Sequence, residues 1–232
     1  MIEQRKAEDR GHARHGWLDS HHTFSFADYF DPAQMGWSAL RVINDDTVQA
    51  GQGFGTHGHR DMEILSYVLE GSLEHRDSMG SGSVLRPGNV QLMSAGSGVR
   101  HSEFNPSETE PVHFLQIWIL PDRNGTQPGY QEDFFDNAGK RGQLQLLASP
   151  DGREGSLKIL QDAQIYAALL NGSERIDYAV KPHRHAYIHV ARGRLIVNGV
   201  SVSAGDGLKI AEEETLQFDQ GHDAEFLLFD LP

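Results

Sequence analysis

The chain of 232 residues contains no cysteine, which excludes disulfide bonds and thiolate metal sites. No segment approaches the ~18 consecutive apolar residues of a membrane-spanning helix, so we expect no membrane partner. Positive charge is scarce: 20 Lys and Arg stand against 33 Asp and Glu, a net charge of −13, so we expect no nucleic-acid partner. The first residues are charged and hold no hydrophobic segment, which predicts a cytoplasmic protein without a signal peptide.

Residues that favour turns and strands are abundant. The 25 glycines and 9 prolines indicate many turns and short strands. The segment PVHFLQIWIL at 111–120 has side chains that can pack on both of its faces, as in a central strand. No segment has a strong helical period. We therefore predict an all-β protein.

The two halves of the chain resemble each other. SYVLEGSLEH at 66–75 and IHVARGRLIVNG at 188–199 each contain an apolar strand, a glycine turn and a second strand, and an H-x-H pair precedes each copy. Internal duplication of a β-barrel is the simplest interpretation. Because a polar, turn-rich segment follows the first copy, we predict domains at 1–125 and 146–232 and a connecting segment at 126–145.

The first H-x-H pair, His57 and His59, has a matching partner. Residues i and i+2 of a strand lie on one face, roughly 6–7 Å apart, and His101 and Glu103 have the same spacing. If the two strands face each other, three imidazoles and one carboxylate converge. This donor set suits a divalent transition metal and leaves coordination positions open. Glu63 is a rival carboxylate, for which a ligand, an orienting group and a solvated residue are all open interpretations.

The remaining histidines of the N-terminal half carry no such pairing in the sequence. We expect the isolated histidines to be hydrogen-bonded or exposed, namely His75, His113 and, in the C-terminal half, His222. We expect the early histidines to be structural or exposed, namely His12, His15, His21 and His22.

Together these motifs resemble those of the cupin superfamily. The first cupin motif is matched by Gly51, the H-x-H pair, Glu63 and Gly71, and the second by His101 and Asn105. Two departures stand out: Ser94 occupies a position that is usually proline, and two extra residues precede the histidine of the second motif.

Those departures resemble the pirin branch of the superfamily. Pirin motifs are present as HTFSFADYFDP at 22–32, HGHRDME at 57–63, VLEG at 68–71 and SAGSGVRHSEFN at 94–105. The resemblance covers residues 10–120 closely and the rest of the chain more loosely. It implies two tandem cupin domains of jelly-roll type, a metal-binding N-terminal domain and a degenerate C-terminal one.

The resemblance also implies which residues bind the metal. The ligands would be His57, His59, His101 and Glu103, with Glu63 only a neighbour. The ion would be one divalent transition metal, with iron(II) the first expectation and zinc, manganese, nickel, copper and cobalt as alternatives. A second site is not expected at the histidines of the C-terminal half, His183, His185 and His189.

The similarity to bacterial quercetin 2,3-dioxygenases implies an activity. The expected enzyme cleaves a flavonol such as quercetin with dioxygen and releases carbon monoxide, with Glu103 as the catalytic base. The alternative is a non-enzymatic, iron-dependent regulatory module of the pirin type that binds a protein partner. A sugar isomerase is a third hypothesis, which the apolar residues near the site disfavour. We expect a monomer.

Overall fold

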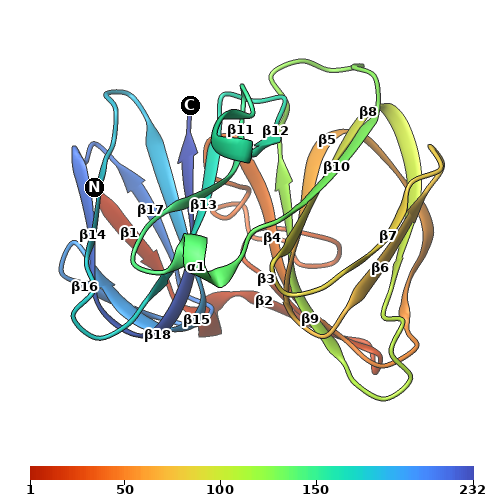
Figure 1. The fold of residues 1–232 in the computed structure, drawn as a ribbon, viewed down its shortest axis with the longest axis horizontal. Helices are drawn as coiled ribbons and strands as arrows, with labels where there is room; N and C mark the ends of the chain where they lie inside the picture. Colours follow the sequence, from red (N-terminus) through yellow and green to blue (C-terminus); the bar gives the residue numbers. More distant parts are fainter. The chain divides into compact units, whose positions relative to one another are not determined.

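The computed structural model describes residues 1–232, and its regular elements are strands apart from three short helical segments, so the prediction of an all-β protein is confirmed. Its two compact units comprise residues 11–134 with 157–161, and residues 1–10 with 135–156 and 162–232. We call them the N-terminal unit and the C-terminal unit (Figure 1). The helices are too short and too polar to cross a membrane.

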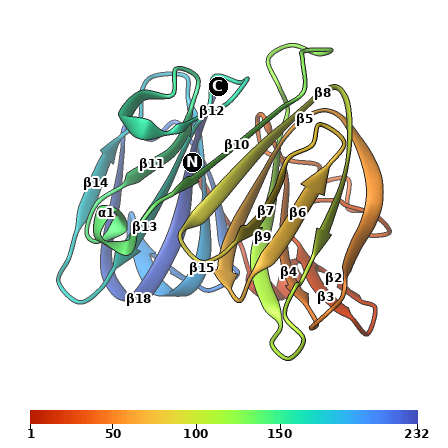
Figure 2. The same cartoon turned by 45° about the vertical axis from the view of Figure 1, so that its right-hand side comes forward.

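The N-terminal unit is built on a nine-stranded antiparallel sheet in the order β2-β3-β4-β9-β5-β8-β6-β7, with β10 on β8 (Figure 2). Its strands are β2 (Gly11–Arg14), β3 (Leu18–His22), β4 (Leu40–Val48), β5 (Gly53–Glu70), β6 (Leu73–Asp77), β7 (Gly82–Leu85), β8 (Asn89–Phe104), β9 (Val112–Ile119) and β10 (Gly129–Phe134), and the short β12 (Leu157–Lys158) belongs to the same unit. The long strand β5 therefore lies between β9 and β8, and β8 lies between β5 and β6.

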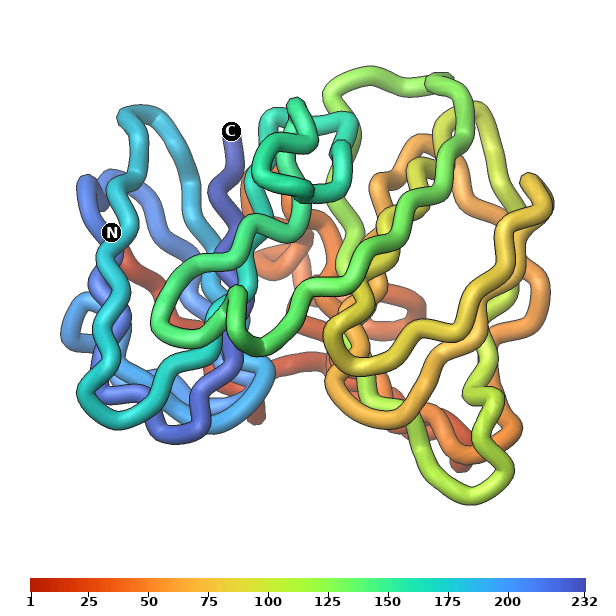
Figure 3. The backbone as a smooth tube through the Cα atoms, in the orientation of Figure 1, coloured from red at the N-terminus to blue at the C-terminus, as the bar shows by residue number.

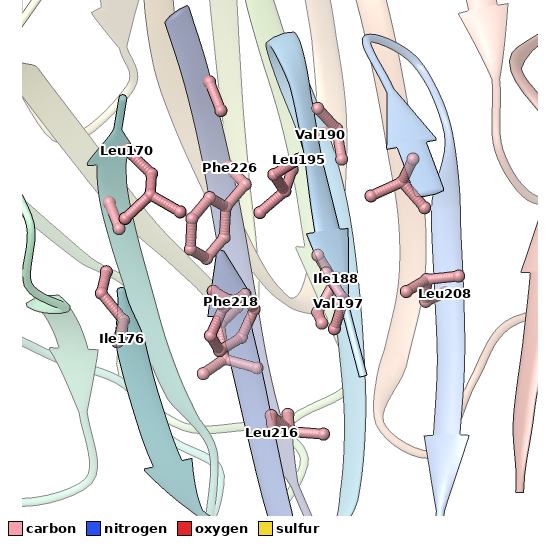
Figure 4. Close-up of a cluster of buried hydrophobic side chains, with 14 of the residues drawn as sticks. Leu170, Ile176, Ile188, Val190, Leu195, Val197, Leu208, Leu216, Phe218 and Phe226 are labelled. Atoms are coloured by element: carbon pink, nitrogen blue, oxygen red, sulfur yellow. The ribbon is translucent and has the colours of Figure 1, made fainter. Parts of the chain in front are cut away.

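In the C-terminal unit the strand order is β1-β17-β15-β18-β13-β11, with β14 on β18 and β16 on β15. Its elements are β1 (Ile2–Arg5), η1 (Ala7–Asp9), α1 (Asn137–Lys140), β11 (Gln145–Ser149), η2 (Arg153–Gly155), β13 (Gln164–Leu170), β14 (Ile176–Ala179), β15 (His185–Val197), β16 (Val200–Ser203), β17 (Gly207–Ala211) and β18 (Thr215–Leu231). A cluster of buried apolar side chains forms the core of this unit, as Figure 4 shows for ten labelled residues including Ile188, Phe218 and Phe226.

The compact units do not coincide with the boundaries predicted from the sequence. Strand β1 pairs with β17, from Ile2 opposite Ile210 to Arg5 opposite Gly207, so the first residues belong to the C-terminal unit; the red start of the tube lies beside blue strands in Figure 3. Strand β10 pairs with β8 and completes the N-terminal unit rather than forming a connection. Both strands find partners far away in the sequence, which a composition-based boundary cannot detect.

Strand β5 is accessible in its first half and buried in its second, and the histidine pair lies in the accessible half. Its second half, from Ile64 to Leu69, is buried, whereas the first half is largely accessible. The pairing of β5 with β8 shifts register between Phe54 and His57 and again between His59 and Asp61. Such irregularities bend a strand and re-aim its side chains. The two histidines thus lie on the short stretch between two shifts.

Candidate metal centre

Three histidines from β5 and β8 converge in the N-terminal unit. His57 lies directly opposite His101 in the β5–β8 register. The ring centroids of His57, His59 and His101 are 4.5–4.8 Å apart, and their ligand atoms all lie within 4.8 Å of one another. The predicted meeting of the H-x-H pair with the first residue of H-x-E is therefore present in the structure.

The nitrogen atoms of this group point toward one another. Nδ1 of His57 donates to the carbonyl oxygen of Gly55 at 2.8 Å, which leaves Nε2 with the lone pair. That Nε2 lies 3.1 Å from Nε2 of His101. Burial and the nearby His57 lower the pKa of His59 to about 4, and burial and the neighbouring histidines lower that of His101 to about 2. These two imidazoles are therefore neutral near pH 7, the form that a metal ion requires.

Glu103 is the carboxylate next to these rings. Its side chain is buried, and its carboxylate lies within 4.8 Å of the ring nitrogens of His101 and His75. Ser66 Oγ lies 3.1 Å from Oε1, and Gln116 Nε2 donates to Oε2 at 2.7 Å. Burial raises the pKa of Glu103 to about 7. Three imidazole nitrogens and a held carboxylate fit a single divalent transition metal ion, whose preferred donors are these groups.

A pocket of about 200 Å³ opens onto this group of residues. His57, His59 and Glu103 form part of its wall. Apolar side chains supply much of the remainder, namely Ala13, Leu18, Phe26, Ala27, Phe54 and Trp118. The Trp118 ring packs edge-on against two other rings, with centroid distances of 5.0 Å to His59 and 5.3 Å to Phe26. A flat, largely apolar ligand suits such a pocket.

Part of the pocket wall is polar, and sequence reasoning missed it. Ser20 donates to Asp46, and Nδ1 of His22 lies 2.8 Å from Oδ1 of Asn44. All four residues, with Gln116, line the pocket. Burial raises the pKa of Asp46 to about 7. These side chains come from the adjacent strands β3 and β4, and only the alternation within each strand could have suggested that they share a face.

Glu63 lies outside the groups of potential metal ligands. Its buried carboxylate accepts hydrogen bonds from Ser94 Oγ at 3.0 Å and from the backbone N–H of Leu160 at 3.1 Å. Burial raises its pKa. Two of the three interpretations that the sequence left open are therefore excluded: Glu63 is not a solvated residue, and it does not belong to the group of potential metal ligands. It attaches the segment 157–161 to the N-terminal unit.

The remaining histidines of this unit have other partners. His113 Nε2 lies 2.6 Å from Oδ1 of Asp45. His12 and His21 stack at 4.3 Å on the β2–β3 hairpin beside Asp19. Oδ1 of Asp19 lies 2.8 Å from Nε2 of His12, and Oδ2 accepts two hydrogen bonds from the Arg14 guanidinium. We therefore assign the group of His12, Asp19 and His21 to surface ion pairing.

The histidines of the C-terminal unit do not repeat the arrangement around His57. His183 is exposed and precedes β15, and His185 begins that strand with Nδ1 2.9 Å from the carbonyl oxygen of Pro232. His189 is fully buried within the same strand. The absence of a second metal site there stays a prediction.

Comparison with known proteins places the chain in a family. Residues 3–119 match the Pirin family model, and residues 146–231 match the model described as the quercetinase C-terminal cupin domain. The quercetin 2,3-dioxygenase of Escherichia coli is 53% identical over 100% of this chain and 99% of its own length. A pirin-like protein of Caulobacter vibrioides is 40% identical over 99% of both chains.

Solved structures agree with the sequence comparisons. The crystal structure of the bacterial pirin YhhW from Escherichia coli in complex with nickel(II) has a TM-score of 0.95 at 53% identity, covering 100% of this chain and 99% of that one. A second crystal structure of YhhW from Escherichia coli has a TM-score of 0.96 at 53% identity, covering 100% of this chain and 98% of that one. The predicted pair of tandem cupin domains is confirmed, and the chain belongs to the pirin family.

Proposed function

We propose that the protein is a metal-dependent dioxygenase that cleaves a flavonol such as quercetin. One observation carries the proposal: the ligand atoms of His57, His59 and His101 lie within 4.8 Å of one another, Glu103 lies beside His101, and His57, His59 and Glu103 form part of the wall of a largely apolar pocket. A relative with 53% identity over the full chain is named quercetin 2,3-dioxygenase, which supports this substrate class. In the proposed reaction the flavonol consumes one dioxygen, and the products are the ring-opened ester and carbon monoxide.

The proposed ligands are His57, His59, His101 and Glu103, and the proposed ion is iron(II). Nickel is a strong alternative, because a relative with 53% identity was solved with nickel(II). Neutral imidazole and carboxylate donors also accept zinc, manganese, copper and cobalt, so these ions belong in the same test. The proposal further includes a cytoplasmic monomer.

The chain's own residues would position the substrate in two ways. Phe26, Phe54 and Trp118 bury the flat ring system and exclude water. The polar wall around Asp46 offers hydrogen-bonding groups to ring hydroxyls. When bound, the metal supplies Lewis acidity that polarises substrate oxygens.

Glu103 is the proposed general base. Its carboxylate is part of the pocket wall, where one of its oxygens would take the proton of the flavonol hydroxyl. Ser66 and Gln116 hold the carboxylate by hydrogen bonds, so the base keeps its orientation while it gains and returns the proton. Buried, oriented groups of this kind contribute because they need no rearrangement during the reaction.

The decisive experiment measures dioxygen consumption and carbon monoxide release. Metal-free protein is loaded in parallel with iron(II), nickel(II), manganese(II), cobalt(II), copper(II) and zinc(II), each bound amount is measured, and quercetin is added. His57→Ala treated in the same way is the matched control. Carbon monoxide in a one-to-one ratio to dioxygen, lost in the variant, is the expected result.

A protein that binds metal but turns over no flavonol would contradict the proposed activity. The alternative of a regulatory module would then gain support if the oxidation state of bound iron changed the affinity for a protein partner. Failure to bind any of the six metals would contradict the proposed metal centre itself.

A further inference from the structure

A third pair of polar residues at spacing two lies beside the proposed metal ligands. Strand β6 neighbours β8 on the side away from β5. In this register His75 lies opposite Glu103, and Asp77 lies opposite His101. His75 and Asp77 therefore flank β8 on one side, while His57 and His59 flank it on the other. Sequence reasoning treated His75 as an isolated histidine because the order of the strands is not visible locally.

Hydrogen-bonding contacts link this pair to His101. Nδ1 of His101 lies 3.4 Å from Nδ1 of His75, and Nε2 of His75 lies 3.1 Å from Oδ2 of Asp77. The side chains of His75 and Asp77 are 0% exposed. Water therefore does not compete for these contacts, and each ring nitrogen has to be matched by its protein neighbour.

The surroundings hold both side chains in one orientation. Oδ1 of Asp77 accepts the backbone N–H groups of Met79 at 2.8 Å and Ser81 at 3.0 Å, which leaves Oδ2 for His75. The ring of Tyr130 stacks on His75 with centroids 5.0 Å apart and an interplanar angle of 29°. The hydroxyl of Tyr130 in turn donates to Glu132 at 2.9 Å.

The direction of each hydrogen bond follows from chemistry. A carboxylate only accepts, so Nε2 of His75 must carry a hydrogen. A neutral imidazole has a single N–H, so Nδ1 of His75 is then an acceptor. Nδ1 of His101 must donate to it, which leaves the lone pair of His101 on Nε2. That is the nitrogen 3.1 Å from Nε2 of His57, on the side where the other histidines converge.

We propose that His75 and Asp77 are positioning residues that hold His101 as its Nδ1–H tautomer and so present its Nε2 to the metal ion. This inference rests on the proposed metal centre and deepens it. It describes a chain of contacts from Asp77, at the turn 77–81, through the His75 ring to the proposed ligand His101. Outer partners of this kind typically contribute about 10–100-fold to metal affinity.

The first test determines the hydrogen-bond direction in the unaltered protein. Zinc(II)-loaded protein with 15N-labelled histidine is examined by nuclear magnetic resonance. We expect the hydrogen on Nδ1 of His101, a 15N–15N coupling across the hydrogen bond to Nδ1 of His75, and the hydrogen of His75 on Nε2. A His75 ring that carries its hydrogen on Nδ1 would overturn the inference without any variant having to fold.

The second test measures nickel(II) affinity in variants that separate shape from hydrogen bonding. His75→Phe keeps a ring but removes the acceptor, and we expect about 10–100-fold weaker binding. His75→Gln restores an acceptor oxygen and should recover part of the loss. His113→Phe is the matched control, because His113 also pairs with an aspartate in this unit but does not contact the ligands; its affinity should stay within about twofold.

Asp77→Asn is the sharpest variant because its shape hardly changes. The amide oxygen is needed by the N–H groups of Met79 and Ser81, so the amide NH₂ would face His75. This makes Nε2 of His75 an acceptor and turns its Nδ1 into a donor that opposes Nδ1–H of His101. We expect about 10-fold or greater loss of nickel(II) affinity.

These outcomes separate this inference from the proposed function. If the wild-type protein binds nickel(II) and both His75→Phe and Asp77→Asn bind it equally tightly, the positioning role is wrong while the metal centre stands. If wild type itself binds no metal, the metal centre fails first. If flavonol turnover is absent but the affinity changes appear, only the activity fails.

Discussion

The N-terminal and C-terminal units pair their longest strands in the same manner but fill the interior differently. Strands β5 and β8 are antiparallel neighbours, as are β15 and β18. Strands β5 and β8 carry three histidines whose ligand atoms converge, with the buried Glu103 beside them, whereas the core cluster of the C-terminal unit is apolar, and its Phe218 and Phe226 stack at 4.7 Å between ring centroids. One architecture therefore supports a metal centre or a packed core, and the inward side chains decide which.

The second H-x-H pair shows why a repeated sequence motif does not have to repeat the local geometry. His57 and His59 both belong to β5, so they share a face. His183 has a φ of 64° and precedes β15, whereas only His185 is in the strand. The rule that residues i and i+2 point the same way holds for a strand and not for the turn before it. The second pair thus lacks the geometry that makes the first one a chelating pair.

Removing one histidine from each pair should give the largest contrast between the units. His57→Ala should weaken nickel(II) binding by more than about 100-fold and abolish flavonol turnover, because a ligand matters more than its outer partners. His185→Ala should leave both unchanged. Isothermal titration and oxygen consumption measure the two effects, and an equal loss in both variants would contradict the comparison.

Replacing the carboxylate should separate chemistry from binding within the N-terminal unit. Glu103→Gln keeps the shape of the side chain but removes its ability to take a proton, so turnover should fall by about 10²–10⁴-fold. Nickel(II) affinity should fall less than turnover does. Full turnover by the metal-loaded variant, followed as carbon monoxide release, would rule out Glu103 as the base.

Opening a cavity in the C-terminal core should change stability without changing the metal centre. Phe226 is fully buried, and Phe226→Ala should lower the free energy of unfolding by about 3–5 kcal/mol. Denaturant titration measures the loss. The nickel(II) affinity of the folded variant should stay within about twofold, and a tenfold change would show that the packed core and the metal centre are energetically linked.

Asp46 should make the stability of the metal-free N-terminal unit depend on pH. Burial raises its pKa from an ordinary value of 3.8 to about 7, so between these values the folded state binds more protons than the unfolded state. The contribution of Asp46 to stability is then largest below about pH 4 and falls as pH rises to about 7. Asp46→Asn should remove on the order of 4 kcal/mol of this decline, measured as thermal unfolding at a series of pH values.

An unchanged pH profile in Asp46→Asn would assign the decline to other buried carboxylates. Glu103 titrates in the same direction because burial raises its pKa as well. Wild-type protein saturated with nickel(II) is a useful comparison, since Asp46 lines the pocket but is not among the proposed ligands.

Several features could be predicted from the sequence because they depend on near neighbours. The alternation of apolar and polar residues predicted strands, and the shared spacing of His57 with His59 and of His101 with Glu103 predicted which side chains share a face. The structure brings the three histidines together and places Glu103 beside His101. The resemblance to pirins, drawn from motifs between residues 22 and 105, is confirmed by the family match.

Other features were missed because they depend on which strands become neighbours. His75 and Asp77 carry the same spacing as the ligands, but only the order β5-β8-β6 places them behind His101. The polar pocket wall of His22 and Asp46 forms because β3 pairs with β4. Nothing in either segment alone indicates those partners.

The sequence by itself determined the donor atoms and their spacing along each strand, since side chains of a strand alternate with a period of two. Only the tertiary structure decided which strands pair and in what register, and so which residues surround the proposed ion. It also assigned β1 and β10 to units that the predicted boundaries had separated them from. The physical reason is that strand pairing joins backbone groups that are distant in the chain, whereas residue spacing is local.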